Sequence, residues 1–520
     1  MSFARDVTTV GTAALFSRLL AFFRDVGIAA VLGAGVLSDA YFAALQIPNL
    51  FRRLLAEGAL NSAFVPMWLR IRDEQGVDGA RGFAERALGT MTIALAAVAI
   101  LCIVFAPTVV HLLAPGFTIG EDRFAVAVAF VRLSAAYVAV AGVVAVAAAI
   151  LNAEGRVGAV AFAVVIFNGV FVTAVLLIVA LGVQASFGVG ATLSVMIVVA
   201  GLAQLMLIGS ALMRVEARPR RLSVRPSPEV RRLFAQAVPG VVAAGMPQVT
   251  LIAGTMIASS SQAAVSWLYY ATRLYELPLG VVSIAIASVI VPIIAASVRA
   301  GSDERIATAQ SRAFEIALGL ALPSAVAFAV LADSIAGGLF ERGAFGPHDT
   351  AMVAAALAAI SAGLPGHVLE KVFAAVAFAH EDTRTPMITA LCGLAAAVAG
   401  AVTLFPRDGH VGVAAAIAMS GWVGAGALGL VVWQRGWLRV DRDARRRLPR
   451  ILLATAAMGA AIGGGHALIA SVFNVSGTAI ARIATLALLV AAGLAVYLGC
   501  IQAFGVARLS ELRAAVRKQL

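Results

Sequence analysis

The chain has 520 residues, of which 61% are hydrophobic and only 13% are charged. A soluble globular protein carries about 25% charged residues, so this composition excludes one, and long unbroken apolar runs exclude a membrane β-barrel. The net charge of +12 comes almost wholly from arginines in short segments between apolar runs, where they set membrane orientation; it does not indicate nucleic-acid binding.

Fourteen apolar segments of about 20–30 residues are long enough to cross a bilayer as helices. The sequence therefore predicts an all-α polytopic membrane protein. The even count places both termini on one side, and the arginine-rich alternate loops identify that side as the cytoplasm. The predicted helices cover residues 8–32, 37–68, 85–110, 124–151, 158–182, 187–213, 231–258, 263–298, 306–332, 350–379, 385–405, 410–434, 450–472 and 478–505.

The first predicted helix contains Arg18, Arg24 and Asp25. A charged side chain at the bilayer centre costs roughly 2.5–3.5 kcal/mol, so these residues should face protein or water. Neither arginine has an acid three or four positions away, and we expect neither to have a local counter-ion. Two interpretations remain open: a structural ion pair with an acid on another helix, or a binding site for an anion.

The second predicted helix carries Asp39, Pro48, Arg52 and the pair Arg53 and Glu57. Arg53 and Glu57 stand four positions apart and should neutralise each other, whereas Arg52 has no local acid. Pro48 should bend the helix. We expect Asp39 to cap or gate near the outer helix end rather than to bind an anion.

The second half of the chain also carries charged residues within its predicted helices. Arg273 and Glu276 are three positions apart, so they either neutralise each other or leave Arg273 to act with Arg24 and Arg52. On the tenth predicted helix, Glu370 and the adjacent Lys371 should compensate each other. Gly459 and Gly463 allow close helix packing, or line a groove for a lipid chain.

An internal repeat relates the two halves of the chain. Ser62-x-x-x-Pro66 recurs as Ser288-x-x-x-Pro292, and the turn at Glu154 recurs at Asp382, at offsets of 226 and 228 positions. The repeat predicts two six-helix lobes in the same orientation, residues 1–222 and 223–448, followed by two extra helices and a tail, 449–520. Such an arrangement is typical of alternating-access transporters, which bind their cargo near the membrane midplane.

The sequence contains no Walker motif for nucleotide hydrolysis, no HExxH and no CxxC pair. We expect no cofactor, no metal site and no catalytic residues. These observations favour a transporter over an enzyme.

Several segments resemble the MurJ (MviN) family of lipid II flippases, within a superfamily of multidrug and polysaccharide exporters. They are SRLLAFFRD (17–25), SDAYFA (38–43), IPNLFRRLLAEGALNSAFVP (47–66), RLYELPLG (273–280) and DTRTP (382–386). The resemblance implies export of the undecaprenyl-pyrophosphate-linked peptidoglycan precursor, lipid II, from the inner to the outer leaflet of the bacterial cytoplasmic membrane. It implies that substrate binds in a cationic cavity lined by Arg18, Arg24, Arg52 and Arg273. The supporting or gating residues that it implies are Asp25, Asp39, Pro48 and Glu276.

The resemblance also implies that the two last helices form a lipid-tail groove. The eleventh predicted helix contains no Asn or Asp, which argues against the sodium site of some relatives. We expect a monomer in the membrane, with the cell-wall synthesis machinery as a candidate partner. The alternatives are an exporter of drugs, cations or another polyprenyl-linked glycan, an anion channel lined by arginines, and a non-transporting scaffold.

Overall fold

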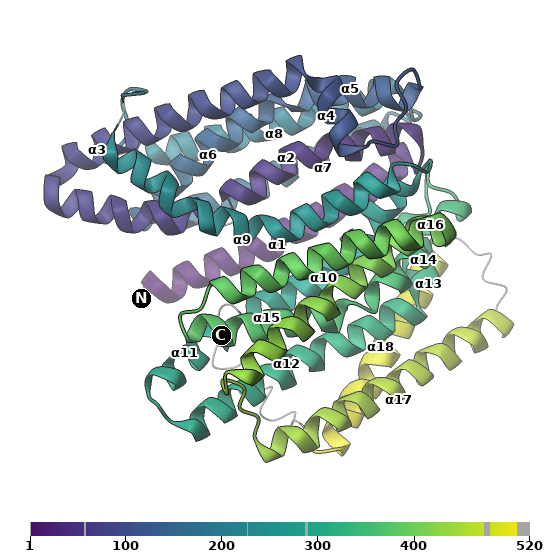
Figure 1. Ribbon diagram of the computed structural model, residues 1–520. Coiled ribbons are helices and arrows are strands. Elements are labelled where there is room, and N and C mark those ends of the chain that lie inside the picture. Colours follow the sequence, from purple (N-terminus) through teal and green to yellow (C-terminus); the bar gives the residue numbers. More distant parts are fainter. Residues whose placement is uncertain (1, 57–58, 226, 287–289, 473–478, 507–520) are drawn as a thin grey trace. The chain divides into compact units, whose positions relative to one another are not determined.

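The computed structural model describes residues 2–56, 59–225, 227–286, 290–472 and 479–506, and every regular element within these ranges is helical (Figure 1). In the described part of the chain, nine helical segments are long and apolar enough to cross a membrane. The predicted all-α membrane protein is therefore confirmed. The chain divides into two compact units: unit 1 is Met1–Ser266 with Gly343–Phe345, and unit 2 is Trp267–Arg342 with Gly346–Leu520.

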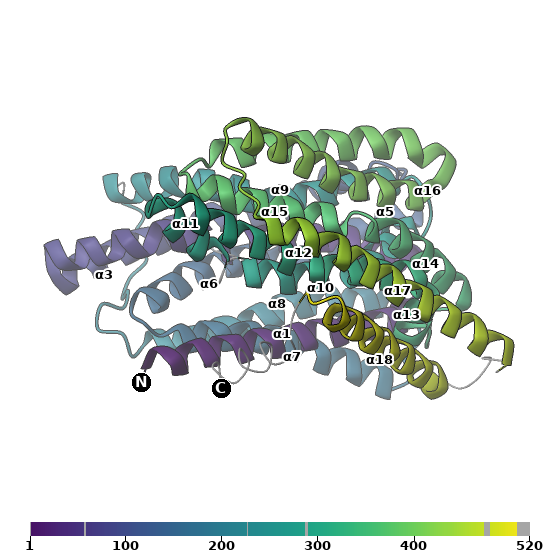
Figure 2. The same cartoon turned by 90° about the horizontal axis from the view of Figure 1, so that it is seen from below.

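Unit 1 is built from long apolar helices packed side by side. The segment α1 lies along α7, α3 lies along α6, and α9 packs on α2 and α3; the first of these pairs is visible in Figure 2. The helices are α1 (Ser2–Leu32), α2 (Val36–Ala56), α3 (Ala59–Val104), α4 (Ala106–Leu113), α5 (Asp122–Ser134), α6 (Ala136–Ala153), α7 (Val157–Ala180), α8 (Phe187–Leu212) and α9 (Pro228–Ala258).

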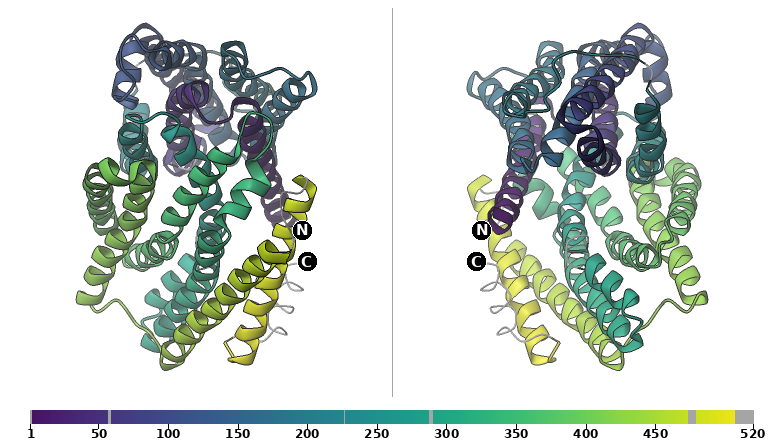
Figure 3. Two further views of the ribbon diagram at one scale, coloured as in Figure 1. Left: turned by 90° about the vertical axis from the view of Figure 1, so that its right-hand side faces the viewer. Right: turned by 90° about the vertical axis from the view of Figure 1, so that its left-hand side faces the viewer.

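Unit 2 contains the remaining helices, and the first turn of α10 belongs to unit 1. Helix α15 packs on α16, and α17 packs on both α12 and α18; α17 and α18 run side by side in Figure 3. The helices are α10 (Ala264–Ala285), α11 (Val291–Arg299), α12 (Asp303–Val330), α13 (Ala332–Phe340), α14 (Pro347–Ser361), α15 (Leu364–Ala379), α16 (Arg384–Gln434), α17 (Arg442–Val472) and α18 (Ala479–Ala503).

Some predicted boundaries are wrong. The sequence predicts a loop over residues 69–84 because they are rich in charge. In the structure this segment is part of helix α3, and within it Gly76, with φ +70°, departs from helical geometry. Charged residues with good helix propensity extend a helix beyond the membrane as readily as they end one. The predicted break between helices 385–405 and 410–434 is confirmed, because α16 leaves helical geometry at Gly409, whose φ is +55°.

Glycines on α17 produce close packing, one of the two interpretations of that sequence. A Cβ atom at Gly459 would lie 2.8 Å from Val326 Cγ1 on α12, so a larger residue there would force Val326 to shift. Helix α18 is tied to α13 by an ion pair between Arg482 and Glu341.

The repeated turns at Glu154 and Asp382 have similar local roles in their own units. Glu154 forms an ion pair with Arg72 and accepts a hydrogen bond from Trp68 Nε1 at 3.2 Å. Asp382 accepts the backbone N–H groups of Arg384 and Thr385 at 3.0 and 2.9 Å and pairs with Arg435. Partial burial opposes ionisation of Asp382, but hydrogen bonds from Thr385 and the Arg435 guanidinium outweigh it and lower the pKa to about 2. Each acid therefore stabilises one turn between two helices.

Candidate functional site

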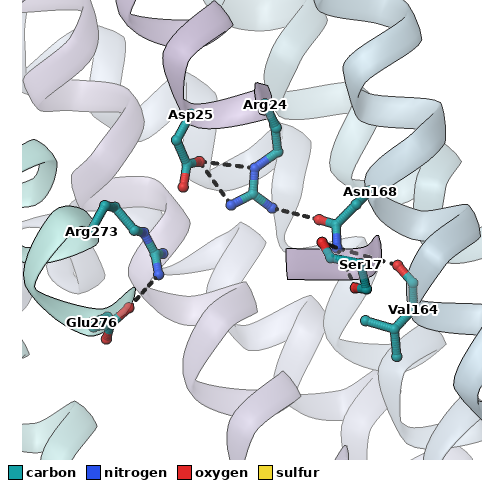
Figure 4. Close-up of polar contacts among 7 residues, drawn as sticks. All are labelled: Ser17, Arg24, Asp25, Val164, Asn168, Arg273 and Glu276. Carbon is teal, nitrogen blue, oxygen red and sulfur yellow. Dashed lines mark hydrogen bonds and ion pairs between the residues drawn. The ribbon is translucent and has the colours of Figure 1, made fainter. Parts of the chain in front are cut away.

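Arg24, on α1, is held by a bidentate contact with the residue that follows it. Its Nε and Nη2 donate to Oδ1 of buried Asp25 at 2.9 and 2.8 Å, and its Nη1 donates to Asn168 Oδ1 at 3.1 Å (Figure 4). The guanidinium also lies 5.8 Å from the ring centre of Phe171 on α7. The expectation that Arg24 has no local counter-ion is therefore wrong: the long side chain turns back along the helix surface to the adjacent carboxylate.

Asn168 connects α7 to α1 through both ends of its amide. Its oxygen accepts from Arg24, while its Nδ2 donates to Ser17 Oγ at 3.0 Å and to the Ser17 carbonyl oxygen at 3.3 Å. Burial makes these bonds structurally important because an unsatisfied polar group away from water is costly. The sequence prediction missed Asn168, although a lone amide in the apolar stretch 157–180 is itself a signal.

Arg18 differs from Arg24. It is partly buried, and within the described ranges it forms no hydrogen bond or ion pair.

Arg52 and Arg24 line the same small pocket in unit 1. Its volume is about 10 Å³, which is about the room one water molecule needs. The pocket walls combine aromatic and polar side chains from α1, α2, α6, α7 and α8, and the residues are Arg24, Tyr41, Leu45, Pro48, Asn49, Arg52, Tyr137, Phe167, Phe171 and Ile197. The structure thus brings together two predicted arginines and Pro48, and adds Tyr41 and Tyr137, which no sequence pattern singled out.

Asp39 is fully buried in the first turn of α2 and caps the start of α10. Its carboxylate accepts the backbone N–H groups of Ala263 at 2.7 Å and Ser266 at 2.9 Å, and the Ser266 hydroxyl at 2.5 Å. A negative charge is stabilised at a helix N-terminus by unpaired N–H groups and the helix dipole. This geometry agrees with the capping role expected for Asp39.

Arg273 and Glu276 form an ion pair on α10 within unit 2. Arg273 Nη1 lies 2.8 Å from Glu276 Oε2, and the guanidinium stacks 4.7 Å from the ring centre of Tyr269 (Figure 4). Of the two interpretations of this pair, local neutralisation is the one the structure displays. Two other predicted features, the Arg53–Glu57 pair and the repeat at Ser288, involve residues 57 and 288, which lie outside the described ranges.

The polar groups of these helices offer hydrogen-bond donors and positive charge. No group of three or more His, Cys, Asp or Glu side chains suited to a metal ion occurs among the described residues. In the described part of unit 1, Arg18 makes no hydrogen bond or ion pair, and Arg24 and Arg52 line one small pocket. Guanidinium groups bind phosphate and carboxylate groups through paired N–H donors.

Comparison with known proteins points in one direction. The family model described as "Lipid II flippase MurJ" matches residues 28–484. The chain is 39% identical to "Probable lipid II flippase MurJ" of Rhizobium meliloti, covering 100% of this chain and 97% of that one, and 31% identical to "Lipid II flippase MurJ" of Burkholderia cenocepacia, covering 84% and 87%.

Solved structures share the fold. A lipid II flippase MurJ in an inward closed conformation has a TM-score of 0.78 at 21% identity and covers 95% of this chain and 98% of its own. An inward-facing multidrug transporter of the MATE family has a TM-score of 0.68 at 16% identity, with 81% and 94% covered.

Proposed function

The chain belongs to the MurJ family of lipid II flippases, and on that basis we propose that it carries the undecaprenyl-pyrophosphate-linked peptidoglycan precursor from the inner to the outer leaflet of the bacterial cytoplasmic membrane. The observation that carries this function is the family match over residues 28–484. The protein is a transporter and not a catalytic enzyme. Lipid II is its substrate, and the protein acts as a monomer with the cell-wall synthesis machinery as a candidate partner.

The pyrophosphate of the substrate binds to arginines in this proposal. Arg18 makes the first contact, since it has no partner within the described ranges. Arg24 exchanges Asp25 for a phosphate oxygen while Asn168 keeps its side chain oriented. Arg52 and Arg273 complete the set, and Glu276 holds Arg273 until substrate replaces it. Arginine suits this role because its charge persists at all physiological pH values.

The transport cycle is alternating access by two six-helix lobes, residues 1–222 and 223–448, within a total of fourteen spans and with both termini in the cytoplasm. The extra helices, residues 449–520, accommodate the polyprenyl tail. In that division Asp39 and Ser266 belong to different lobes, so their hydrogen bonds would keep the periplasmic end closed until substrate is bound. Pro48 lies inside α2, and in this proposal it bends the helix so that Arg52 faces the interior.

Membrane potential is the proposed driving force. Outward movement of net negative charge across an inside-negative membrane gains about 2.3 kcal/mol per charge per 100 mV. The test is translocation of the lipid II headgroup in liposomes that contain the purified protein, with and without an imposed potential. Translocation should require the protein and accelerate with an inside-negative potential. Absence of protein-dependent translocation would contradict the function, and indifference to potential would contradict the driving force.

A further inference from the structure

Three polar side chains lie on one face of α15, inside a segment apolar enough to cross the membrane. His367, Glu370 and Lys371 stand at positions i, i+3 and i+4, so they project from the same side of the helix. The proposed arginine site gives none of them a role. Ionisable residues inside a membrane are rare and costly, which makes this face a candidate site.

His367 connects three helices of unit 2. Its Nδ1 lies 2.7 Å from the Tyr275 hydroxyl on α10 and 3.1 Å from the Gly363 carbonyl oxygen. Its Nε2 lies 3.4 Å from Ser420 Oγ on α16. Protonation or movement of this ring would therefore affect α10 and α16 together.

Glycines on α16 leave room for the same side chains. A Cβ atom at Gly421 would lie 2.4 Å from His367 Nδ1, and a Cβ atom at Gly424 would lie 2.9 Å from the Glu370 carboxyl group. Both polar side chains thus rest against bare backbone of the neighbouring helix. The Glu370 carboxyl group is directed against α16.

Glu370 and Lys371 do not form the close ion pair that the sequence suggested, although the charge of each still acts on the other. Within the described part of the chain, neither makes a hydrogen bond or an ion pair. Glu370 is partly buried. A carboxylate that is partly withdrawn from water and has no hydrogen-bond donor is disfavoured in its ionised form, and proton uptake relieves this cost. The protonated acid is the form of Glu370 that fits this environment.

Among the described residues, the elements packed on α15 supply no charge to Glu370 beyond that of Lys371. On α10, Glu276 is paired with Arg273, and the nearby Tyr275 bonds to His367. Helix α16 has no ionisable residue between positions 411 and 434. The last charged residue of α12 is Glu315, which pairs with Arg447 at 3.3 Å, and α11 carries only its terminal Arg299.

We propose that Glu370 is an intramembrane proton-binding site and that its proton is exchanged during the transport cycle. The proton binds a carboxylate oxygen in the state described here and leaves when α15 and α16 separate and water reaches the carboxylate. One proton enters from one aqueous side and departs to the other, and no other bond changes. This inference rests on the proposed function and deepens it by naming a coupling ion.

The first test needs no substrate. Infrared difference spectra of the purified full-length protein in liposomes at neutral pH should contain the carbonyl band of a protonated carboxylic acid, shifted in D₂O. Glu370→Gln should remove the band and Glu370→Asp should retain one. The matched control Asp408→Asn, which changes an exposed acid of α16, should leave it intact. A band that is absent from the unaltered protein, or that persists in folded Glu370→Gln, overturns the proposal.

The second test measures coupling. Headgroup translocation of lipid II in liposomes should change severalfold with an imposed pH gradient in the unaltered protein and in Asp408→Asn. Glu370→Gln should translocate at a rate that no longer responds to the gradient. A response that survives in Glu370→Gln overturns the coupling role. Failure of the unaltered protein to translocate lipid II at all would instead count against the proposed function, because the infrared result does not depend on it.

Discussion

The hydroxyl oxygens of Ser38 and Ser266 lie 2.9 Å apart, although 228 positions separate the two residues in the chain. Glu154 and Asp382 have the same separation. The first turns of α2 and α10 therefore meet at positions related by the repeat, and Asp39 secures the contact by capping α10. We regard this contact as the closure at one end of the transport path.

Removal of the Asp39 cap should weaken this closure. Asp39→Ala leaves the buried N–H groups of Ala263 and Ser266 without an acceptor, which should cost about 1–3 kcal/mol. Asp39→Asn keeps an acceptor and should cost less. Thermal unfolding of the two purified variants checks this order, and equal stability of Asp39→Ala and the unaltered protein would contradict the role of the cap.

Arg18 and Arg24 should respond differently to substitution. Arg18→Ala removes a group without a partner in the described ranges, so transport should fall at least tenfold while the unfolding temperature stays the same or rises. Arg24→Ala should lower both the transport rate and the unfolding temperature, because it leaves buried Asp25 without its guanidinium partner. Parallel measurement of translocation and thermal unfolding separates the two effects. A large loss of stability in Arg18→Ala would show that Arg18 has a structural role.

Asn168 controls how tightly Arg24 is held. Asn168→Asp would add a second carboxylate beside the guanidinium, so Arg24 should be neutralised, and transport should fall although the protein still folds. Thr173→Val is the matched control on α7, since the Thr173 hydroxyl bonds only its own helix at Gly169. Translocation by Asn168→Asp at the rate of the control would argue against substrate exchange at Arg24.

The Asp382 carboxylate should make the stability of the folded protein depend on pH, and the direction of this dependence follows from its pKa. Its pKa of about 2 lies below the ordinary value of 3.8, so the carboxylate stabilises the folded state fully above about pH 4 and loses this effect as pH falls towards 2. Asp382→Asn should reduce stability at neutral pH by less than about 1 kcal/mol, as is typical of exposed ion pairs. Unfolding temperatures of the two proteins should converge between pH 4 and pH 2, and a constant difference would contradict this assignment.

The sequence predicts the helical architecture well because apolar runs of membrane length have few alternatives. It does less well where charged residues continue a helix, as they do before and after Gly76 in α3. Local charge pairs were predictable for Arg273 and Glu276, which are adjacent on one helix face.

The candidate site could not be predicted in full, because it is built from contacts that residue spacing along one helix does not reveal. Asn168 reaches Arg24 from 144 positions away, and Asp39 reaches Ser266 from 227 positions away. Arg24 reaches Asp25 only through the rotamer that its side chain adopts, and adjacent residues on a helix normally point apart. Glu370 and Lys371 illustrate the reverse error: they are adjacent, yet they form no ion pair.

The most direct test of lipid II export is depletion of the protein from growing cells, followed by measurement of how much lipid II each leaflet contains. Lipid II should accumulate in the inner leaflet and fall in the outer one. Re-expression of the unaltered protein should restore the distribution, whereas Arg18→Ala, expressed at the same level, should not. An unchanged distribution after depletion would contradict the proposal that this protein exports lipid II.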